Sequence, residues 1–186
     1  AAVEADARSV APGADGLVYH PYLSSAGEKA PFVDPAARAQ FSGLDPSHTR
    51  AHLLRAVYEG VALAVRHCYD SLPGEPRTVT VSGGGARSDL WRQLIADCLD
   101  TTVRVPAYGE LGAKGAAMLA AVGVDHYPDL DTAIDVMSDT GTTYAPRPGP
   151  ASVYDDLYAY YTAVRESMAD VWSLRRSVAA SFESAE

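Results

Sequence analysis

The sequence predicts an α/β domain in which short strands alternate with helices. Two runs of β-branched residues, at 78–81 and 102–105, are each followed by a segment whose apolar residues recur every three or four positions. Strands joined by helices in this way imply a largely parallel sheet. A length of 186 residues, with 47% hydrophobic and 21% charged residues, agrees with one packed domain and excludes a disordered or fibrous chain.

The first residues are expected to precede this domain. Residues 1–15 are rich in alanine and contain Pro12 and Gly13, which predicts the end of a preceding element followed by a linker. The first residue is not methionine, which is typical of a fragment or of a chain that has lost its initiator. Residues 16–23 then predict a short strand that Pro21 confines to its end or to a sheet edge, because proline donates no ladder hydrogen bond.

A long irregular segment and a long helix come next. Residues 24–44 contain several prolines and glycines and show no periodic pattern, which is unusual for so long a loop in a packed domain. Phe32 and Phe41 predict that this segment packs on the core. From Thr49 to Leu72 the apolar residues form one stripe, which predicts a helix packed on one side and ended by proline and glycine.

The remaining chain continues the alternation and then ends in helices. The expected elements are a glycine turn at 83–85, helices at 88–99 and 110–122 around the strand at 102–105, a short helix at 130–137, a proline-rich link at 146–150, one helix at 153–174 and a fraying tail at 175–186.

The charge and the cysteines narrow the function classes. With 15 lysine and arginine residues against 24 aspartate and glutamate residues, the net charge of −9 repels phosphate backbones, so no nucleic-acid partner is expected. No apolar run is long enough to span a bilayer, so no membrane partner is expected either. Cys68 and Cys98 lie in helical apolar stripes without the spacing of a disulfide or metal site, which predicts reduced thiols and a cytoplasmic location.

The segment Val79–Ser88 is the best local candidate for chemistry. Its strand ends in Gly83, Gly84 and Gly85 and re-enters as a helix, so backbone N–H groups and a helix N-terminus can approach a nucleotide or phosphate. A β-carbon at Gly84 is expected to clash with the ligand or with a φ angle that only glycine tolerates freely. The alternative is a structural turn in which Ser88 only caps the helix, and the residues alone leave both interpretations open.

Other polar residues give weaker signals. His48 and His52 are four positions apart, but no third ligand is near, so exposed or capping histidines are favoured over a metal site. Glu28 and Asp34 are candidate acid–base groups, although surface carboxylates and turns explain them equally well. The sequence has no nucleophile elbow, which leaves a hydrolase without support.

A longer pattern resembles a known family. The segment Ala39–Leu44, followed by His52 and Leu53 and then by Ala56–Glu59, resembles the C-terminal signature of the FGGY family of carbohydrate kinases. The signature spans a loop and a helix with fixed spacing, so a chance match is not expected. The resemblance extends on both sides of the signature and covers about residues 16–174.

The resemblance implies a fold and a reaction. The implied fold is an actin-like ATPase (ribonuclease H-like) domain, with a mixed sheet and helices on both faces, and residues 16–174 would form the C-terminal domain of such a kinase. The implied reaction transfers the γ-phosphoryl group of ATP to a sugar hydroxyl, with Mg²⁺ held mainly by the nucleotide phosphates. A ketopentose, as in xylulokinase, is the first choice of substrate, and a polyol such as glycerol is the second.

The resemblance also assigns residues and partners. The catalytic base is expected in an N-terminal domain that this sequence lacks, so no catalytic residue is assigned here and the chain alone is expected to be inactive. The expected partners are ATP or ADP, a sugar, the chain's own N-terminal domain and a second copy in a possible homodimer. The residues carried over are Gly84 and Gly85 beside the adenosine, Gly83 in the turn, Ser88 near the adenine, and Glu28, Lys29 and Arg38 as candidates for the cleft.

Two other function classes stay open. A non-catalytic actin-like module would use the same glycine turn only as a structural element. A small Rossmann-like binding domain would need an acidic residue after the second strand, where Pro106 stands instead.

Overall fold

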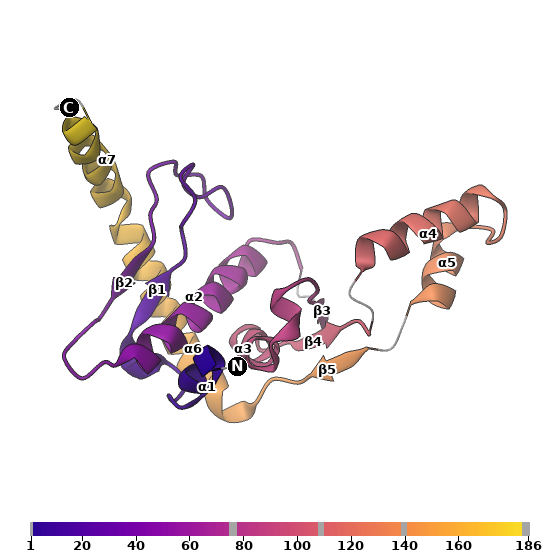
Figure 1. Cartoon of the computed structure of the whole chain (residues 1–186), viewed down its shortest axis with the longest axis horizontal. Helices are drawn as coiled ribbons and strands as arrows, with labels where there is room; N and C mark the ends of the chain where they lie inside the picture. The colour runs from indigo at the N-terminus through magenta and orange to yellow at the C-terminus, as the bar shows by residue number, and fades with distance from the viewer. Residues whose placement is uncertain (1, 75–77, 108–109, 139–140, 184–186) are drawn as a thin grey trace.

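The computed structural model describes residues 2–74, 78–107, 110–138 and 141–183. Its elements are, in chain order (Figure 1), α1 (Ala2–Arg8), η1 (Ala14–Gly16), β1 (Val18–His20), β2 (Gln40–Ser42), α2 (Arg50–Asp70), β3 (Thr78–Thr80), η2 (Gly85–Arg87), α3 (Asp89–Leu99), β4 (Thr102–Val105), α4 (Leu111–Gly123), α5 (Leu130–Met137), β5 (Thr142–Tyr144), α6 (Pro148–Ser167) and α7 (Ala169–Glu183). None of the helices in these ranges has the length and hydropathy that a membrane span requires.

The strands form two sheets, and the prediction of a largely parallel sheet was wrong. β3 and β4 are parallel, but β5 returns antiparallel beside β4, with Val103 opposite Tyr144. β1 and β2 form a separate antiparallel pair. The prediction failed because the chain reverses through α4 and α5 before β5, and because β2 and β5, at three residues each, are too short for a periodic pattern.

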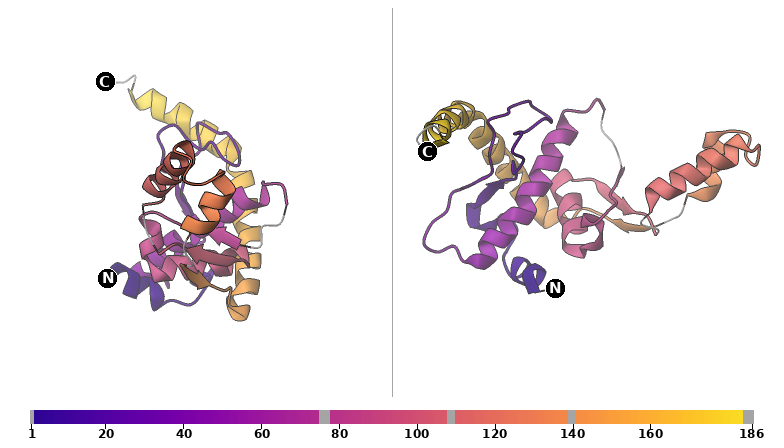
Figure 2. Two further views of the ribbon diagram at one scale, coloured as in Figure 1. Left: turned by 90° about the vertical axis from the view of Figure 1, so that its right-hand side faces the viewer. Right: turned by 45° about the horizontal axis from the view of Figure 1, so that its top comes forward.

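α2 occupies the centre of the molecule, and β1, α1 and α3 pack around it (Figures 1 and 2). A β-carbon at Gly60 would lie 2.1 Å from the carbonyl oxygen of Tyr19, so a glycine is needed for this close approach of α2 to β1. The largest cluster of buried side chains joins α2, α3, α6 and the β3–β4 pair, with Leu63, Leu94 and Val103 fully buried. The helix was predicted correctly, but the face of α2 that builds the core carries Ala56, Ala62 and Leu63, whereas the predicted apolar stripe, with Val57, Val61 and Val65, is only partly buried.

The helix α3 covers one face of the β3–β4–β5 sheet, and residues of α4 and α5 meet the other face at a cavity. Val79 and Val103 are buried on the face that α3 covers. Thr80 and Arg104 face the other side, because successive side chains of a strand alternate, and they line a cavity of about 280 Å³ together with residues of α4 and α5. The α4–α5 hairpin extends away from the body of the molecule (Figures 1 and 2).

The single helix predicted at 153–174 is two helices. α6 already begins at Pro148, inside the expected link, because the fixed φ of proline suits the first helical turn. The axis breaks at Met168, and α7 then runs through the residues expected to fray, as far as Glu183. Sequence periodicity did not reveal the break because the apolar spacing continues across it.

The two aromatic residues of the irregular segment differ in their surroundings. Phe32 packs between helices, with its ring parallel to that of the buried Trp172 and 6.3 Å from it. Phe41 is 39% exposed, and its ring packs against the ring of Tyr19. The prediction that Phe41 is buried was therefore wrong. The reason is that, among the described strands, β2 pairs only with β1, so Phe41 is covered by Tyr19 opposite it while the rest of its ring stays open to solvent.

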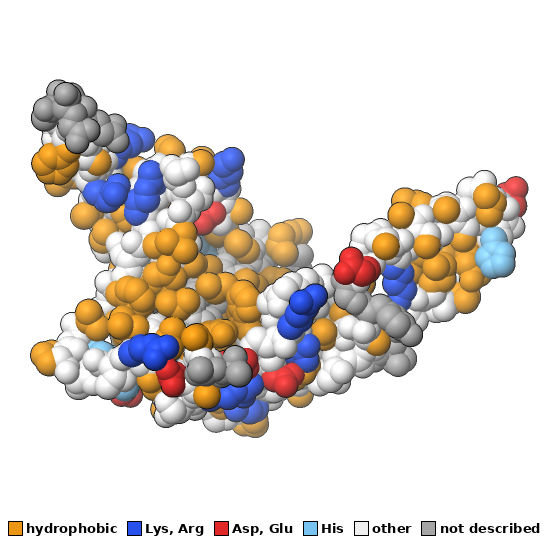
Figure 3. Space-filling model, viewed as in Figure 1, with side chains coloured by type: hydrophobic (Ala, Val, Ile, Leu, Met, Phe, Trp, Pro, Cys, Tyr) orange, Lys and Arg blue, Asp and Glu red, His pale blue; other side chains and the backbone are white. Residues whose placement is uncertain are grey.

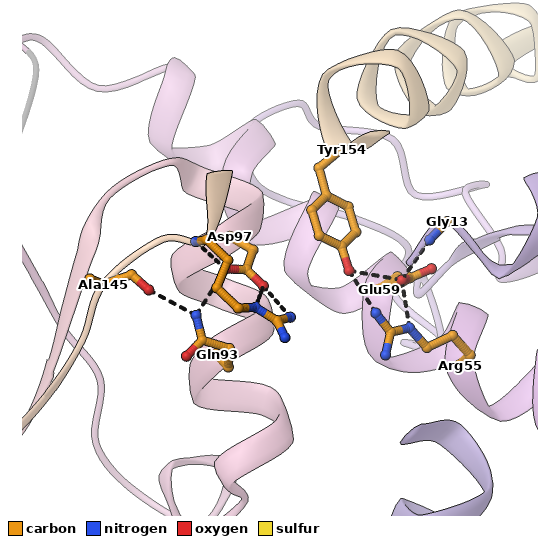
Figure 4. Close-up of polar contacts among 8 residues, drawn as sticks. Gly13, Arg55, Glu59, Gln93, Asp97, Ala145 and Tyr154 are labelled. Carbon is orange, nitrogen blue, oxygen red and sulfur yellow. Dashed lines mark hydrogen bonds and ion pairs between the residues drawn. The ribbon is translucent and has the colours of Figure 1, made fainter. Parts of the chain in front are cut away.

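A buried polar network ties α6 to α2 (Figure 4). Glu59, which is 1% exposed, accepts hydrogen bonds from the Nε of Arg55 at 2.6 Å, the hydroxyl of Tyr154 at 2.9 Å and the N–H of Gly13 at 2.9 Å. Arg55 also donates to the hydroxyl of Tyr154. Burial is the main cause that raises the pKa of Tyr154, and the neighbouring carboxylate adds to it, so the phenol stays protonated.

A second network joins α3 to the segment that enters α6 (Figure 4). Asp97 is 1% exposed and accepts hydrogen bonds from the backbone N–H and the guanidinium of Arg147. Gln93 donates to the same carboxylate and to the carbonyl oxygen of Ala145. These bonds satisfy a buried charge and fix the direction in which the chain leaves β5.

Candidate functional site

The glycine turn joins the carboxyl end of β3 to α3. Gly83 has a φ angle of +84°, a left-handed conformation that favours glycine. Gly85 is needed for space, because a β-carbon there would lie 2.4 Å from the ring of Trp91. Both glycines are therefore explained by local structure alone.

Gly84 differs from its two neighbours. Its φ of −61° and ψ of −41° suit any residue, and a β-carbon there would meet no atom within 4 Å. The expectation that the backbone conformation requires glycine at this position was therefore wrong. The structure leaves open space beside Gly84, into which a ligand can approach the main chain.

Two cavities flank the turn and meet at Gly84. The first, of about 500 Å³, lies between the turn and α2 and is almost wholly apolar, with Tyr58, Val61 and Trp91 among its lining residues. The second, of about 580 Å³, lies between the turn and the residues after β4 and is polar; it is lined by Gly83, Gly84, Arg87, Arg92 and Glu110, among others.

Ser88 caps α3, and its hydroxyl is largely used by the protein. Its Oγ accepts from the N–H of Trp91 at 3.2 Å and donates to the Oε1 of Glu4 at 3.1 Å. A hydroxyl offers one donor and two acceptor sites, so Ser88 keeps one acceptor for a ligand. The interpretation of Ser88 as a helix cap is confirmed, and what its hydroxyl still offers to a ligand is an acceptor for an N–H or O–H group.

Glu4 of α1 occupies the N-terminus of α3. Besides the bond from Ser88, its Oε1 accepts from the N–H of Leu90 at 3.1 Å. Burial raises the pKa of Glu4, but its bonds to Leu90, Arg8 and Ser88 outweigh this, so that the pKa is lowered and the carboxylate stays ionised. A negative charge from the protein thus already sits where a helix N-terminus attracts anions.

Arg92, on the second turn of α3, contacts the glycine turn from the side of β5. Its Nε donates to the carbonyl oxygen of Ala86, and its Nη1 donates to Asp89 at 2.9 Å and to the hydroxyl of Tyr144 at 2.7 Å. Tyr144 also donates to Asp89. Sequence analysis did not identify Glu4, Arg92 or Tyr144, since no local pattern indicates contacts across such separations.

The candidate cleft residues 28, 29 and 38 lie in the irregular segment and not at the glycine turn. The carboxylate of Glu28 accepts from the backbone N–H of Lys29 at 2.8 Å. The guanidinium of Arg38 donates to three backbone carbonyls of its own segment, those of Ser25, Pro35 and Ala37. The side chain of Lys29 makes no hydrogen bond or ion pair with the described residues, so of the three it is the one free to contact another molecule.

Of the two histidines that sequence spacing paired, His52 completes the capping box of α2, and His48 is a buried side chain in the turn before that helix. The Nδ1 of His52 accepts from the N–H of Thr49 at 3.1 Å, and its Nε2 bonds to Asp15 at 3.1 Å. The Nδ1 of His48 accepts from the N–H of Asp45. Within the described ranges, no cluster of three or more histidine, cysteine, aspartate or glutamate side chains could hold a metal ion.

Comparison with known proteins places these features in a family context. Residues 2–124 match the family model described as "FGGY family of carbohydrate kinases, C-terminal domain". The chain is 40% identical over 163 residues to erythritol kinase from Brucella abortus, which covers 87% of this chain and 31% of that protein. It is 38% identical over 158 residues to gluconokinase from Bacillus licheniformis, covering 81% of this chain and 30% of the relative.

The three-dimensional structure is similar to a solved kinase. Xylulose kinase from Lactobacillus acidophilus aligns with a TM-score of 0.86 at 26% identity, over 92% of this chain and 35% of that one. The chain therefore spans about a third of the length of the relatives that it matches.

Proposed function

Because this chain belongs to the FGGY family of carbohydrate kinases and has the actin-like ATPase fold, we propose that it is the C-terminal, nucleotide-binding domain of an ATP-dependent carbohydrate kinase. The observation that carries the proposal is the glycine turn with open space at Gly84, between an apolar and a polar cavity. In open α/β sheets, ligands bind beyond the carboxyl ends of the strands, which is where this turn lies.

The same geometry favours the adenosine half of ATP over its phosphates as the group bound here. The carboxylate of Glu4 already neutralises the N-terminus of α3, so a phosphate at that point would meet a like charge. A purine ring and its ribose are uncharged, and the apolar cavity beside Gly84 and Gly85 suits their flat faces. Ser88 retains an acceptor that fits the amino group of adenine.

The reaction that we propose for the whole protein is transfer of the γ-phosphoryl group of ATP to a sugar hydroxyl. The described residues of this chain do not form a metal site, so Mg²⁺ is assigned to the nucleotide phosphates and to groups outside them. This domain would hold the nucleotide and form one side of a cleft that closes over the reactants and excludes water. With the base also outside the chain, the domain alone is expected to phosphorylate no sugar.

The proposed acceptor is a ketopentose, with a polyol as the second candidate. A ketopentose is supported by the structural likeness to a protein named xylulose kinase over 92% of this chain. A polyol is supported by the 40% identity to a protein named erythritol kinase. Assays of the complete protein with xylulose, ribulose, erythritol, glycerol and gluconate separate the two, because the preferred acceptor will give the highest kcat/KM.

An exposed apolar face supports a partner domain. Hydrophobic side chains gather over α2 in Figure 3, and Val57, Val61 and Val65 of α2 line two apolar cavities of about 500 and 440 Å³ on this face. Among the described strands, β3 pairs only with β4, so its other edge is open. We propose that the kinase's own N-terminal part packs here; a second copy of the chain is the alternative, which size-exclusion chromatography distinguishes.

Two further parts of the proposal concern the cleft and the compartment. Lys29 would face the opposing domain or the substrate, while Glu28 and Arg38 shape the segment that carries it. We also propose a cytoplasmic location, because Cys68 and Cys98 are free thiols, which a reducing compartment maintains.

The substitution Gly84→Val tests the nucleotide site. Because nothing lies within 4 Å of the added β-carbon and the φ angle is ordinary, the free protein is expected to keep its melting temperature. ADP affinity, measured by titration with NMR detection of the turn amides, is expected to fall by about tenfold or more, which is about 1.4 kcal/mol. Gly123→Val, at the end of α4, is the matched control, because that glycine also has open space around it.

The outcomes separate the candidate functions. Loss of ADP binding in Gly84→Val but not in Gly123→Val supports the site. A wild-type chain whose turn resonances do not respond to ADP would indicate a non-catalytic actin-like module instead. Equal affinity of the wild type and Gly84→Val would remove the turn from the nucleotide site.

A further inference from the structure

The glycine turn depends on other parts of the chain for its order. Gly83 and Gly84 have no side chains to pack, and glycine has the greatest backbone freedom of any residue. The main chain is held at Ala86, whose N–H donates to the carbonyl oxygen of Gly83 at 3.2 Å. Ala86 itself is buried, with 6% of its surface exposed.

Arg92 binds the carbonyl group of the same residue, Ala86. Its Nε donates to the carbonyl oxygen of Ala86, and hydrogen bonds from a charged donor are stronger than those between neutral groups. The Nε and Nη1 donors of Arg92 are both used inside the protein. The guanidinium therefore acts on the turn through Ala86, although it also lines the polar cavity beside Gly83.

The guanidinium is in turn fixed by two groups. Asp89 lies 2.9 Å from its Nη1, and the hydroxyl of Tyr144 lies 2.7 Å from it. Tyr144 lies in β5, 52 positions after Arg92 in the sequence. Through Arg92, the glycine turn is therefore connected to a strand that is distant along the chain. The side chain of Arg92 is 20% exposed, which reduces the freedom of water to replace these bonds.

We propose that Arg92 is a positioning residue of the nucleotide site: it holds the glycine turn in the conformation that admits the adenosine beside Gly84. The inference rests on the proposed function and extends it to a residue outside the turn. Tyr144 and Asp89 support Arg92 in this role by fixing its guanidinium.

The test compares Arg92→Lys with Arg66→Lys in the 186-residue chain. Arg66 is a matched control: it is 21% exposed, donates to the carbonyl oxygen of Cys98 and to Asp155, and lies over the ring of Tyr158. Arg66 belongs to α2 and lies near the C-terminal end of α3, whereas the glycine turn precedes the N-terminal end of α3. Lysine keeps the charge but lacks the rigid fork of donors, so neither variant can reproduce its arginine's bonds.

Three measurements are made on each protein: the melting temperature, amide hydrogen exchange of residues 83–88 without nucleotide, and the dissociation constant of ADP. Both substitutions are expected to lower the melting temperature by similar amounts. Only Arg92→Lys is expected to speed exchange in the turn and to raise the dissociation constant by about tenfold, or about 1.4 kcal/mol. Tyr144→Phe, which keeps the ring and removes one anchor of Arg92, is expected to show a smaller change in the same direction.

The outcomes distinguish this inference from the proposed function. If the wild type binds ADP, and Arg92→Lys binds it as tightly as Arg66→Lys does, the positioning role is wrong while the nucleotide site stands. Unchanged exchange in the turn of Arg92→Lys also contradicts the role. If the wild type binds no ADP, the proposed function fails, and the inference fails with it. Should Arg92→Lys not fold, Tyr144→Phe provides the same comparison.

Discussion

At Gly85 a hydrogen atom is all that fits between the backbone and the ring of Trp91. A β-carbon there would lie 2.4 Å from the ring, whereas one at Gly84 would meet nothing within 4 Å. Two adjacent glycines in one turn therefore have opposite tolerance to a side chain.

This difference gives a prediction on stability. Gly85→Ala is expected to lower the free energy of unfolding by about 1–3 kcal/mol, because Trp91 must move. Gly84→Ala is expected to raise it by about 0.4–1 kcal/mol, because alanine restricts the unfolded chain and fits the native φ and ψ. Urea unfolding followed by tryptophan fluorescence measures both, and equal values for the two variants would contradict this account of the turn.

His20 is a second residue whose surroundings lead to a measurable effect. It is fully buried, its Nε2 donates to the carbonyl oxygen of Tyr161 at 3.0 Å, and its ring stacks on the ring of Tyr161. The Nδ1 has no partner among the described residues. Burial is the main cause that lowers the pKa of His20 below its usual value of 6.5, and the nearby charge of Arg165 lowers it further.

The consequence is a loss of stability in mild acid. Below a pH of about 6.5 the unfolded chain binds a proton at His20 that the folded chain does not, so the free energy of unfolding falls as the pH drops, by at most about 1.4 kcal/mol per pH unit for this group. His20→Gln is expected to reduce the pH dependence of the free energy of unfolding between about pH 7.5 and 5. An equal slope in wild type and His20→Gln would contradict the assignment.

At the scale of elements, one carboxylate connects α2, α6 and the segment before β1. Glu59 accepts hydrogen bonds from Arg55, Tyr154 and Gly13, and both members of the ion pair are at least 95% buried. Such a pair is costly to break, because the remaining charge cannot reach water. The residue is also the last position of the signature that resembles the kinase family, so the structure gives that position a role in packing.

Glu59→Gln tests this connection. The change leaves Arg55 buried without a counter-charge and is expected to lower the free energy of unfolding by about 3–5 kcal/mol. Glu166→Gln removes a carboxylate that is 68% exposed and paired with Arg165, and should change stability by less than about 0.5 kcal/mol. Both values come from denaturant titration, and a small effect of Glu59→Gln would show that water reaches the network.

The helices and strands also differ in how far local sequence defined them. The helix at 130–137 has the predicted bounds, and α2 lies within the predicted 49–72, because a helix depends on contacts between residues three or four apart. The three-residue strands β2 and β5 depend on partners elsewhere in the chain. The break at Met168 depends on the packing of Trp172 in α7 over the irregular segment.

At the scale of the whole molecule, Lys29 of the irregular segment is a cation whose side chain has no hydrogen bond or ion pair with the described part of the chain. On the proposed function, Lys29→Ala in the complete protein is expected to lower kcat/KM by about tenfold with an unchanged melting temperature, because this side chain has no partner in the described structure. Arg38→Ala is the contrasting variant; it loses bonds to three carbonyls and should lower stability by about 1–2 kcal/mol. Unaltered kinetics in Lys29→Ala would assign the whole segment to packing.

The sequence by itself determined the α/β class, the helices α2 to α5, the glycine turn and the resemblance to the FGGY family, because each is encoded in neighbouring residues or in fixed spacing. Only the tertiary structure decided the direction of β5 and the placement of Trp172. It also decided two hydrogen bonds, from Ser88 to Glu4 and from Arg92 to Tyr144. The last two join residues 84 and 52 positions apart. Such contacts arise when the chain folds back on itself, and no local pattern of residues reports which distant groups will then meet.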